Sequence, residues 1–239
     1  MREPDEQLSA ELEDDTDATF SRASWVRIAP FLAYIGFIVG TDLLQRLAGF
    51  PLSELRWLYA VRIGVVAALL AWYWREYREL RRWDADLPAV FVALLMGGIV
   101  FFLWISLNAP WMLVGSPTGF DPRTGGQLDW TLVTLRLLGA TAVVPLMEEL
   151  FWRSFLMRWI VAPEFGTVDP AQTTLKSVVI SSVLFGVEHN LWLAGIVAGV
   201  AYSWVYVRYR TLWLSILAHA LTNFLLGIWV IQTASWNYW

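Results

Sequence analysis

Seven long apolar segments constrain this chain more than any other feature of its sequence. A helix needs about 20 mostly apolar residues to cross a hydrocarbon core roughly 30 Å thick. Apolar residues make up 57% of the chain and charged residues only 16%, which excludes an ordinary soluble domain. We therefore predict an all-α fold, a polytopic membrane helix bundle with about seven transmembrane helices. The predicted spans are 25–45, 57–75, 88–108, 130–159, 174–190, 191–209 and 211–231.

Composition also divides the chain into parts. The first residues are rich in Asp and Glu and lack an apolar core, so 1–24 is predicted to be an acidic, disordered cytoplasmic tail. Residues 25–128 are predicted to form three N-terminal membrane helices and a loop, and residues 129–239 the remaining four helices. The chain contains no cysteine, which excludes thiolate nucleophiles and Cys-based metal sites. Beyond its acidic head the chain is only mildly basic, which argues against nucleic acid as a partner.

Basic residues indicate how the chain is oriented in the membrane. Lys and Arg accumulate in cytoplasmic loops of membrane proteins. Here they gather in the loop after the second predicted span and after the sixth, at Arg75, Arg78, Arg81, Arg82, Arg208 and Arg210. This pattern predicts a multi-pass protein of the cell (inner) membrane with a cytoplasmic N-terminus. Arg62, near the start of the second span, is expected to extend its side chain towards the interface.

Ionisable and polar residues inside the spans form a short list of candidate functional residues. Each costs a few kcal/mol to insert and usually faces a bundle interior or a wet cavity. Helical rise from the cytoplasmic markers places Glu148, His189 and His219 at depths of about 15, 20 and 14 Å, so one layer could contain all three. The complete list is Glu148, Glu149, Arg153, Glu188, His189, His219 and Asn223.

The spacing of these residues suggests their roles. Arg153 follows Glu149 by four positions, so the two are expected to pair on one helix face. Glu148 lies about 100° away around the helix and lacks such a partner. A carboxylate in an apolar, partly wet pocket is a suitable general base, and His189 could hold a water against it or bind a metal with it. His219 and Asn223, four residues apart, could donate to an oxyanion.

Three motifs within these spans resemble those of a known family. The segments "EELFWR" (148–153), "FGVEH" (185–189) and "HALTN" (219–223) resemble the EExxxR, FxxxH and HxxxN motifs of the type II CAAX prenyl endopeptidases, the CPBP or Abi intramembrane proteases. The resemblance implies CAAX-protease-like catalytic helices over 129–239. It also implies that Glu148 and His189 activate water and that His219 and Asn223 line the oxyanion site. Glu149, Arg153 and Phe185 would then be supporting residues, and a subgroup associated with exosortases is a further lead.

Several alternatives stay open at this level. The predicted activity is hydrolysis of a peptide bond in a membrane-associated protein or peptide, with the lipid bilayer as the other partner. An ion-coupled transporter or proton relay could use the same buried groups, and a catalytically silent immunity or scaffold member of the family is a third possibility. No cofactor is required in the reading we favour, but Glu148, His189 and His219 could bind a divalent metal such as zinc, although the HExxH pattern is missing. Glu188 receives no chemical role.

Overall fold

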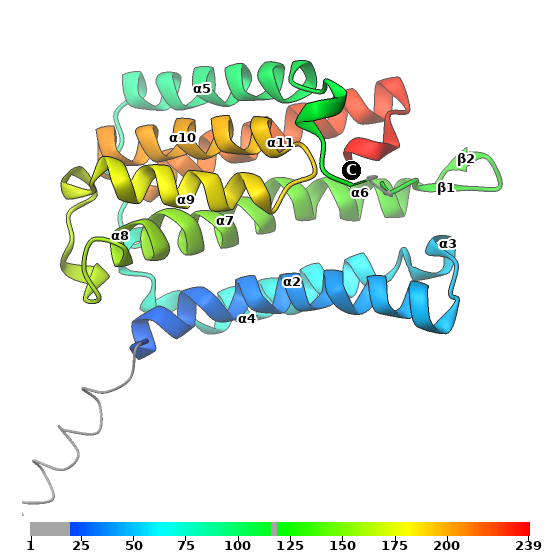
Figure 1. The fold of residues 1–239 in the computed structure, drawn as a ribbon, viewed down its shortest axis with the longest axis horizontal. Coiled ribbons are helices and arrows are strands. Elements are labelled where there is room, and N and C mark those ends of the chain that lie inside the picture. Colours follow the sequence, from blue (N-terminus) through cyan, green and yellow to red (C-terminus); the bar gives the residue numbers. More distant parts are fainter. Residues whose placement is uncertain (1–19, 116–118) are drawn as a thin grey trace, which may run out of the picture.

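The computed structural model describes residues 20–115 and 119–239, and these form a helical bundle (Figure 1). Most of the predicted acidic tail falls on residues 1–19, which lie outside the described residues. Helix α2 begins at Arg22, where the Ser21 side chain accepts a hydrogen bond from the amide of Ser24 and so caps the first turn. The end of the predicted 1–24 tail, from Arg22 onward, is therefore helical.

The helices follow one another with short connections. Their bounds are α2 (Arg22–Ala48), α3 (Leu52–Leu55), α4 (Leu58–Trp72), α5 (Leu87–Ser106), α6 (Trp130–Leu138), α7 (Val144–Glu149), α8 (Met157–Trp159), α9 (Leu175–Val187), α10 (Trp192–Tyr209) and α11 (Leu212–Thr233). Two π-helical stretches, Gly139–Val143 and Leu150–Leu156, join α6, α7 and α8 into one rod. Strands β1 (Arg123–Thr124) and β2 (Gln127–Leu128) pair antiparallel, with Arg123 opposite Leu128.

The predicted spans all coincide with helices, which confirms the all-α membrane bundle. Helix α9 is the exception in length: it has 13 residues and ends at Val187 rather than near 190. At about 1.5 Å per residue it is roughly 20 Å long, which is shorter than the roughly 30 Å hydrocarbon core of a bilayer. Among the described residues, the helical segments long and apolar enough to cross a membrane are Arg22–Ala48, Ser53–Trp72, Leu87–Ser106, Trp130–Trp159 and Leu212–Thr233, so the predicted spans 174–190 and 191–209 form helices that fall short of this criterion.

The bundle has an outer pair of helices and a larger group. Helices α2 and α4 pack on each other and, in Figure 1, form a layer below the other helices. The α6–α8 rod contacts this pair on one side and α9 and α11 on the other. Helix α5 packs against α10 and α11, although the sequence grouped it with the N-terminal helices. Two of the C-terminal helices are therefore also in contact with α5, a helix in which the sequence shows no motif.

Small residues bring α9 and α10 unusually close. Gly195 and Gly199 form a GxxxG pattern on α10, opposite Ser182 and Gly186 of α9. A Cβ added at Gly199 would lie 2.9 Å from the Cα of Ser182, and one added at Gly195 would lie 2.8 Å from the Cα of Gly186. Such small residues allow helix backbones to approach each other in membranes. This contact fixes the end of α9, and with it the position of His189.

Candidate active site

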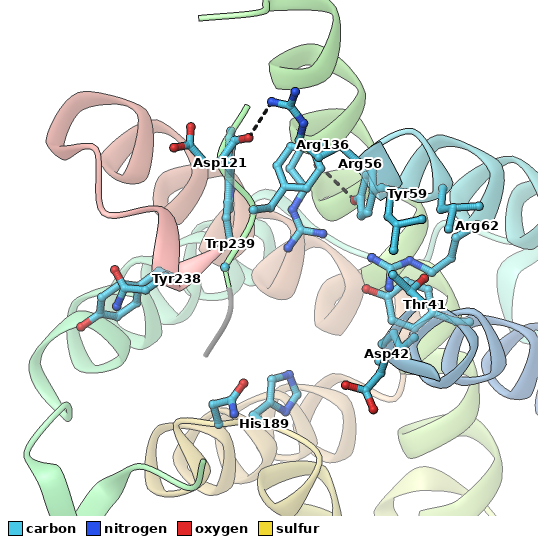
Figure 2. A pocket seen from close by; sticks show the side chains of 18 of the residues that line it. Thr41, Asp42, Arg56, Tyr59, Arg62, Asp121, Arg136, His189, Tyr238 and Trp239 are labelled. Atoms are coloured by element: carbon cyan, nitrogen blue, oxygen red, sulfur yellow. Dashed lines mark hydrogen bonds between the residues drawn. The ribbon is translucent and has the colours of Figure 1, made fainter. Parts of the chain in front are cut away.

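A pocket of about 1340 Å³ opens at the end of the bundle where α2 ends and α4 begins (Figure 2). Its wall includes residues from both those helices, from the end of α5, from the α6–α8 rod, from the α9–α10 turn and from the end of the chain. Glu148 and His189 both line it, so the proposed base and its predicted partner share one cavity. Of the described residues that line the pocket, none is His219 or Asn223.

The backbone around Glu148 departs from a regular α-helix on both sides. Helix α7 is a short α-helical piece between two π-helical stretches, and it ends at Glu149. π-Helical turns are rare and frequently occur at functional sites. The Asn223 side chain donates a hydrogen bond from Nδ2 to the carbonyl oxygen of Ala140, at 2.8 Å, within the first π-helical stretch. Asn223 therefore supports the rod that presents Glu148.

Glu149 is the centre of a buried polar network. Its Oε1 accepts hydrogen bonds from Arg153 at 3.0 Å and from His219 Nδ1 at 2.9 Å, and its Oε2 accepts one from Ser215 at 2.6 Å. The predicted pairing of Glu149 with Arg153 is confirmed, and both side chains are fully buried. The arginine also donates to the carbonyl oxygen of Gly199. Glu149 thus joins its own helix to α11 and, through Arg153, to α10.

The same network orients His219. With Nδ1 held by Glu149, its Nε2 faces Glu148 and lies 3.8 Å from Oε2 of that residue. The ring stacks on Tyr202 with centroids 4.7 Å apart and an angle of 16° between the planes. The sequence missed both Tyr202 and Ser215 because they are common buried residue types whose spacing shows no pattern. Because the hydrogen bond at Nδ1 and the stacking on Tyr202 hold the ring, the position of Nε2 is fixed.

Glu148 differs sharply from its neighbour. The residue is 4% exposed, and its Oε2 has no hydrogen-bond partner among the described residues. Leaving a buried carboxylate oxygen without a partner is costly, so such a group is a functional candidate rather than a source of stability. Glu188 lines the same pocket and its Oε2 is likewise without a partner in the described part of the chain. The sequence analysis assigned no chemical role to Glu188.

His189 follows the end of α9 and is held by its own helix. Its Nδ1 lies 2.7 Å from the carbonyl oxygen of Phe185. A carbonyl can only accept, so Nδ1 carries a proton, and in the neutral ring Nε2 is left as an acceptor. The ring lies edge-on to Trp104 of α5 at 5.2 Å between centroids and packs against Phe185 at 4.7 Å. Phe185 therefore packs against the ring of His189.

Two arginines of the pocket wall correct the sequence interpretation. Arg62 does not simply extend to an interface: it lines the pocket and stacks on Tyr34 and Tyr59. Arg136 of α6 also lines the pocket, beside Tyr59, and was overlooked. The signal for Arg136 was present, because it is a charged residue inside the predicted span 130–159 and such residues are rare and usually functional.

The metal alternative requires ligand side chains that converge on one point. Across residues 20–115 and 119–239, no group of three or more His, Cys, Asp or Glu side chains is placed to hold a metal ion. Nδ1 of His219 bonds Glu149 and Nδ1 of His189 bonds a backbone carbonyl, which leaves Nε2 of each ring available, as in metal-binding histidines whose other nitrogen is held by a second group. The predicted set of Glu148, His189 and His219 is not found as such a group in the described part of the chain, and no step below is derived through a metal.

Comparison with protein families agrees with the motifs. Residues 130–225 match the family model described as Type II CAAX prenyl endopeptidase Rce1-like, and this segment includes the three motifs. These residues belong to the type II CAAX prenyl endopeptidase family. No curated protein and no solved structure matches the chain. At the family level this match supports a CAAX-type membrane protease; the exosortase-associated subgroup stays a prediction.

Proposed function

We propose that the chain is an intramembrane endopeptidase that hydrolyses a peptide bond of a membrane-associated protein or peptide. The observation that carries this proposal is the buried Glu148 carboxylate, which lines a pocket together with His189 and has an oxygen with no partner among the described residues. A base for water must reach a cavity and must not be neutralised by a permanent ion pair. Glu149, by contrast, is fully committed to Arg153, Ser215 and His219.

In the proposed reaction Glu148 takes a proton from a water molecule in the pocket. The acceptor Nε2 of His189 holds the second hydrogen of that water and so directs its oxygen lone pair at the peptide carbonyl. The water oxygen bonds to the carbonyl carbon, and the carbonyl oxygen becomes an oxyanion. When the tetrahedral intermediate collapses, the C–N bond breaks and Glu148 returns its proton to the leaving amine.

The oxyanion would be stabilised by donors already held in place. His219 Nε2 is the nitrogen left free by the bond to Glu149, and it can donate to an oxyanion only when the ring carries a second proton. Asn223 uses Nδ2 on Ala140, and a primary amide has a second N–H for the substrate. Neither residue lines the pocket of Glu148 and His189 among the described residues, so the oxyanion role of His219 and Asn223 stays a prediction, whereas Asn223 also supports the rod that presents Glu148.

The predicted orientation has a consequence for access. The arginines that indicate the cytoplasm lie at the end of the bundle where α4 joins α5, whereas the pocket opens at the other end. With the N-terminus cytoplasmic, the pocket faces the outer side of the membrane. We propose substrates that reach the enzyme from that side or from the plane of the bilayer, whether prenylated or not.

The central test replaces Glu148 by Gln, which removes the base at nearly constant volume. Purified full-length protein in lipid nanodiscs is incubated with a mixed library of apolar peptides, and new peptide termini are identified by mass spectrometry. We expect cleavage by the wild type and a loss of at least about 10²-fold in the Glu148→Gln variant, the lower range for removing a general base.

The matched control is Asp42→Asn, which changes an exposed carboxylate on the same pocket wall that pairs with Arg46. It should cleave like the wild type. Equal cleavage by wild type and Glu148→Gln would refute the proposed mechanism. A wild type that cleaves nothing, although it binds peptides, would instead favour a catalytically silent family member.

A further inference from the structure

Two arginines on the pocket wall share one aromatic ring. The guanidinium carbon of Arg62, on α4, lies 4.8 Å from the ring centroid of Tyr59, and that of Arg136, on α6, lies 4.5 Å from it (Figure 2). Arg62 also lies 4.5 Å from the ring of Tyr34 on α2. The hydroxyl of Tyr59 in turn donates to the backbone carbonyl of Arg136. Three helices thus hold two cations together at one place in the wall.

Neither of these guanidinium groups has an acidic partner among the described residues. No ion pair or side-chain hydrogen bond of Arg62 or Arg136 is found there, and the Nε of each is buried without a partner. The other arginines of the wall are engaged: Arg123 pairs with Asp121 at 2.6 Å, and Arg56 donates to the carbonyl oxygens of Asp121 and Arg123. Arg62 and Arg136 are therefore the cations left to bind an anion in the pocket.

Their surroundings favour an anion strongly. A partly buried charge without a counter-ion is costly, particularly within a membrane-spanning helix. The contacts with Tyr59 and Tyr34 hold the guanidinium groups over aromatic rings and leave the Nε of each without a hydrogen-bond partner among the described residues. A planar guanidinium with free edges matches the two oxygens of a carboxylate, and two such groups would neutralise it with charge to spare.

We propose that Arg62 and Arg136 form a subsite that binds a carboxylate of the peptide substrate. This inference deepens the proposed function and rests on it. Arg136 precedes Glu148 by twelve positions in the same helical rod, which corresponds to about 18 Å along its axis. An extended peptide spans that length in about five residues. The subsite therefore selects substrates with an acidic group about five residues from the bond that is cleaved.

Continuity of the cavity favours a peptide over a lipid as the source of the anion. The same pocket is lined by Arg62, Arg136, Glu148 and His189, so one extended chain can contact the cationic and the hydrolytic ends together. A lipid headgroup at the arginines would need no connection to Glu148. Lipid phosphate shares the chemistry that the arginines recognise, and the experiment is arranged to separate the two.

The probes are two fluorescent apolar peptides that are identical except for Glu or Gln about five residues from the centre. Binding is measured to full-length protein carrying Glu148→Gln, so that cleavage cannot intervene, in nanodiscs of neutral phosphatidylcholine. We expect the Glu peptide to bind about 10-fold more tightly than the Gln peptide, as one charge-assisted pair allows. Adding Arg62→Gln and Arg136→Gln should abolish this preference, whereas Arg46→Gln, at an exposed arginine of the same end, should keep it.

Arg136→Lys provides a second variant if the glutamine substitutions unfold the protein. It keeps the positive charge but loses the planar guanidinium that binds both carboxylate oxygens, so it should weaken the preference for the Glu peptide only in part. The proposal is overturned if the two peptides bind equally to the protein that keeps Arg62 and Arg136. It is also overturned if the preference for the Glu peptide survives the loss of both arginines. Loss of the preference in nanodiscs of anionic phosphatidylglycerol would assign the subsite to lipid phosphate instead, which also overturns it. Because binding is read without cleavage, these outcomes are independent of whether the protein is a protease.

Discussion

At the scale of single residues, Glu148 and Glu149 are adjacent in sequence but occupy opposite environments. About 100° of helical rotation directs Glu149 into a network of donors and leaves Glu148 at the pocket wall. One carboxylate therefore stabilises the bundle, and the other is free for chemistry. The network also fixes the ring nitrogen that His219 presents to Glu148, so the structural glutamate is a positioning residue for the proposed catalytic one.

Replacing Glu149 by Ala should destabilise the protein strongly, because the change strands Arg153 in the interior. Removing one partner of a buried ion pair costs about 3–5 kcal/mol, and Ser215 and His219 lose an acceptor as well. Thermal unfolding in detergent measures the effect. The combination with Arg153→Met should recover part of the loss, since no charge is then left unpaired.

The matched control is another carboxylate four residues from an arginine, Asp42 with Arg46, which is exposed at the surface. Asp42→Ala should change stability by less than about 1 kcal/mol. Comparable losses for Asp42→Ala and Glu149→Ala, or strictly additive losses when Arg153 is also replaced, would show that the Glu149 network contributes no special stability.

At the scale of elements, the features that could be predicted from the sequence are those that repeat along a helix. Hydrophobic length placed the spans, and charge at i, i+4 predicted the Glu149–Arg153 pair. It could not predict that Glu149 also binds Ser215 and His219, because those contacts depend on how α7 is rotated towards α11. The length of α9 was overestimated for a related reason: the residues after Val187 are compatible with a helix, and the close approach of α10 decides where the turn occurs.

Replacing Gly199 by Leu should separate α9 from α10, because the new side chain has no space against Ser182. Overpacking of this kind costs about 1–3 kcal/mol, and it would also displace His189, which lies just after the end of α9. We expect a lower unfolding temperature and reduced peptide cleavage. Gly64→Leu, at a glycine of α4 whose added Cβ meets nothing within 4 Å, is the control. A Gly199→Leu protein as stable and active as Gly64→Leu would contradict the proposed close packing.

At the scale of the whole molecule, the α2–α4 pair is joined to the remaining helices by a polar cluster far from the pocket. Arg27 of α2 donates two hydrogen bonds to Glu79, at 2.9 and 2.7 Å, and Glu79 also accepts one from Ser154 of the rod. Glu79 lies in the connection between α4 and α5. One carboxylate thus links three parts of the bundle at the end opposite to the pocket.

This cluster should make stability depend on pH. Burial alone would raise the pKa of Glu79, but the hydrogen bonds and charge of Arg27, with the hydroxyl of Ser154, hold it below its ordinary value of 4.5. A carboxyl whose pKa is lower in the folded state stabilises the fold above its unfolded pKa, and this contribution is lost as the pH falls through the folded value. Wild-type stability should therefore decrease as the pH falls below about 4.5.

Glu79→Gln should lower stability near neutral pH and flatten its decline in acid, since the group that titrates is gone. Unfolding temperatures measured in detergent between about pH 3 and pH 7 give both quantities. Glu76→Gln is the matched control, because Glu76 lies in the same connection and pairs with Arg22 of α2. The Arg22 side chain is 79% exposed, so losing this ion pair should have little effect on stability. Parallel pH curves for the wild type and Glu79→Gln would show that the junction between the α2–α4 pair and the rod depends on apolar packing rather than on this carboxylate.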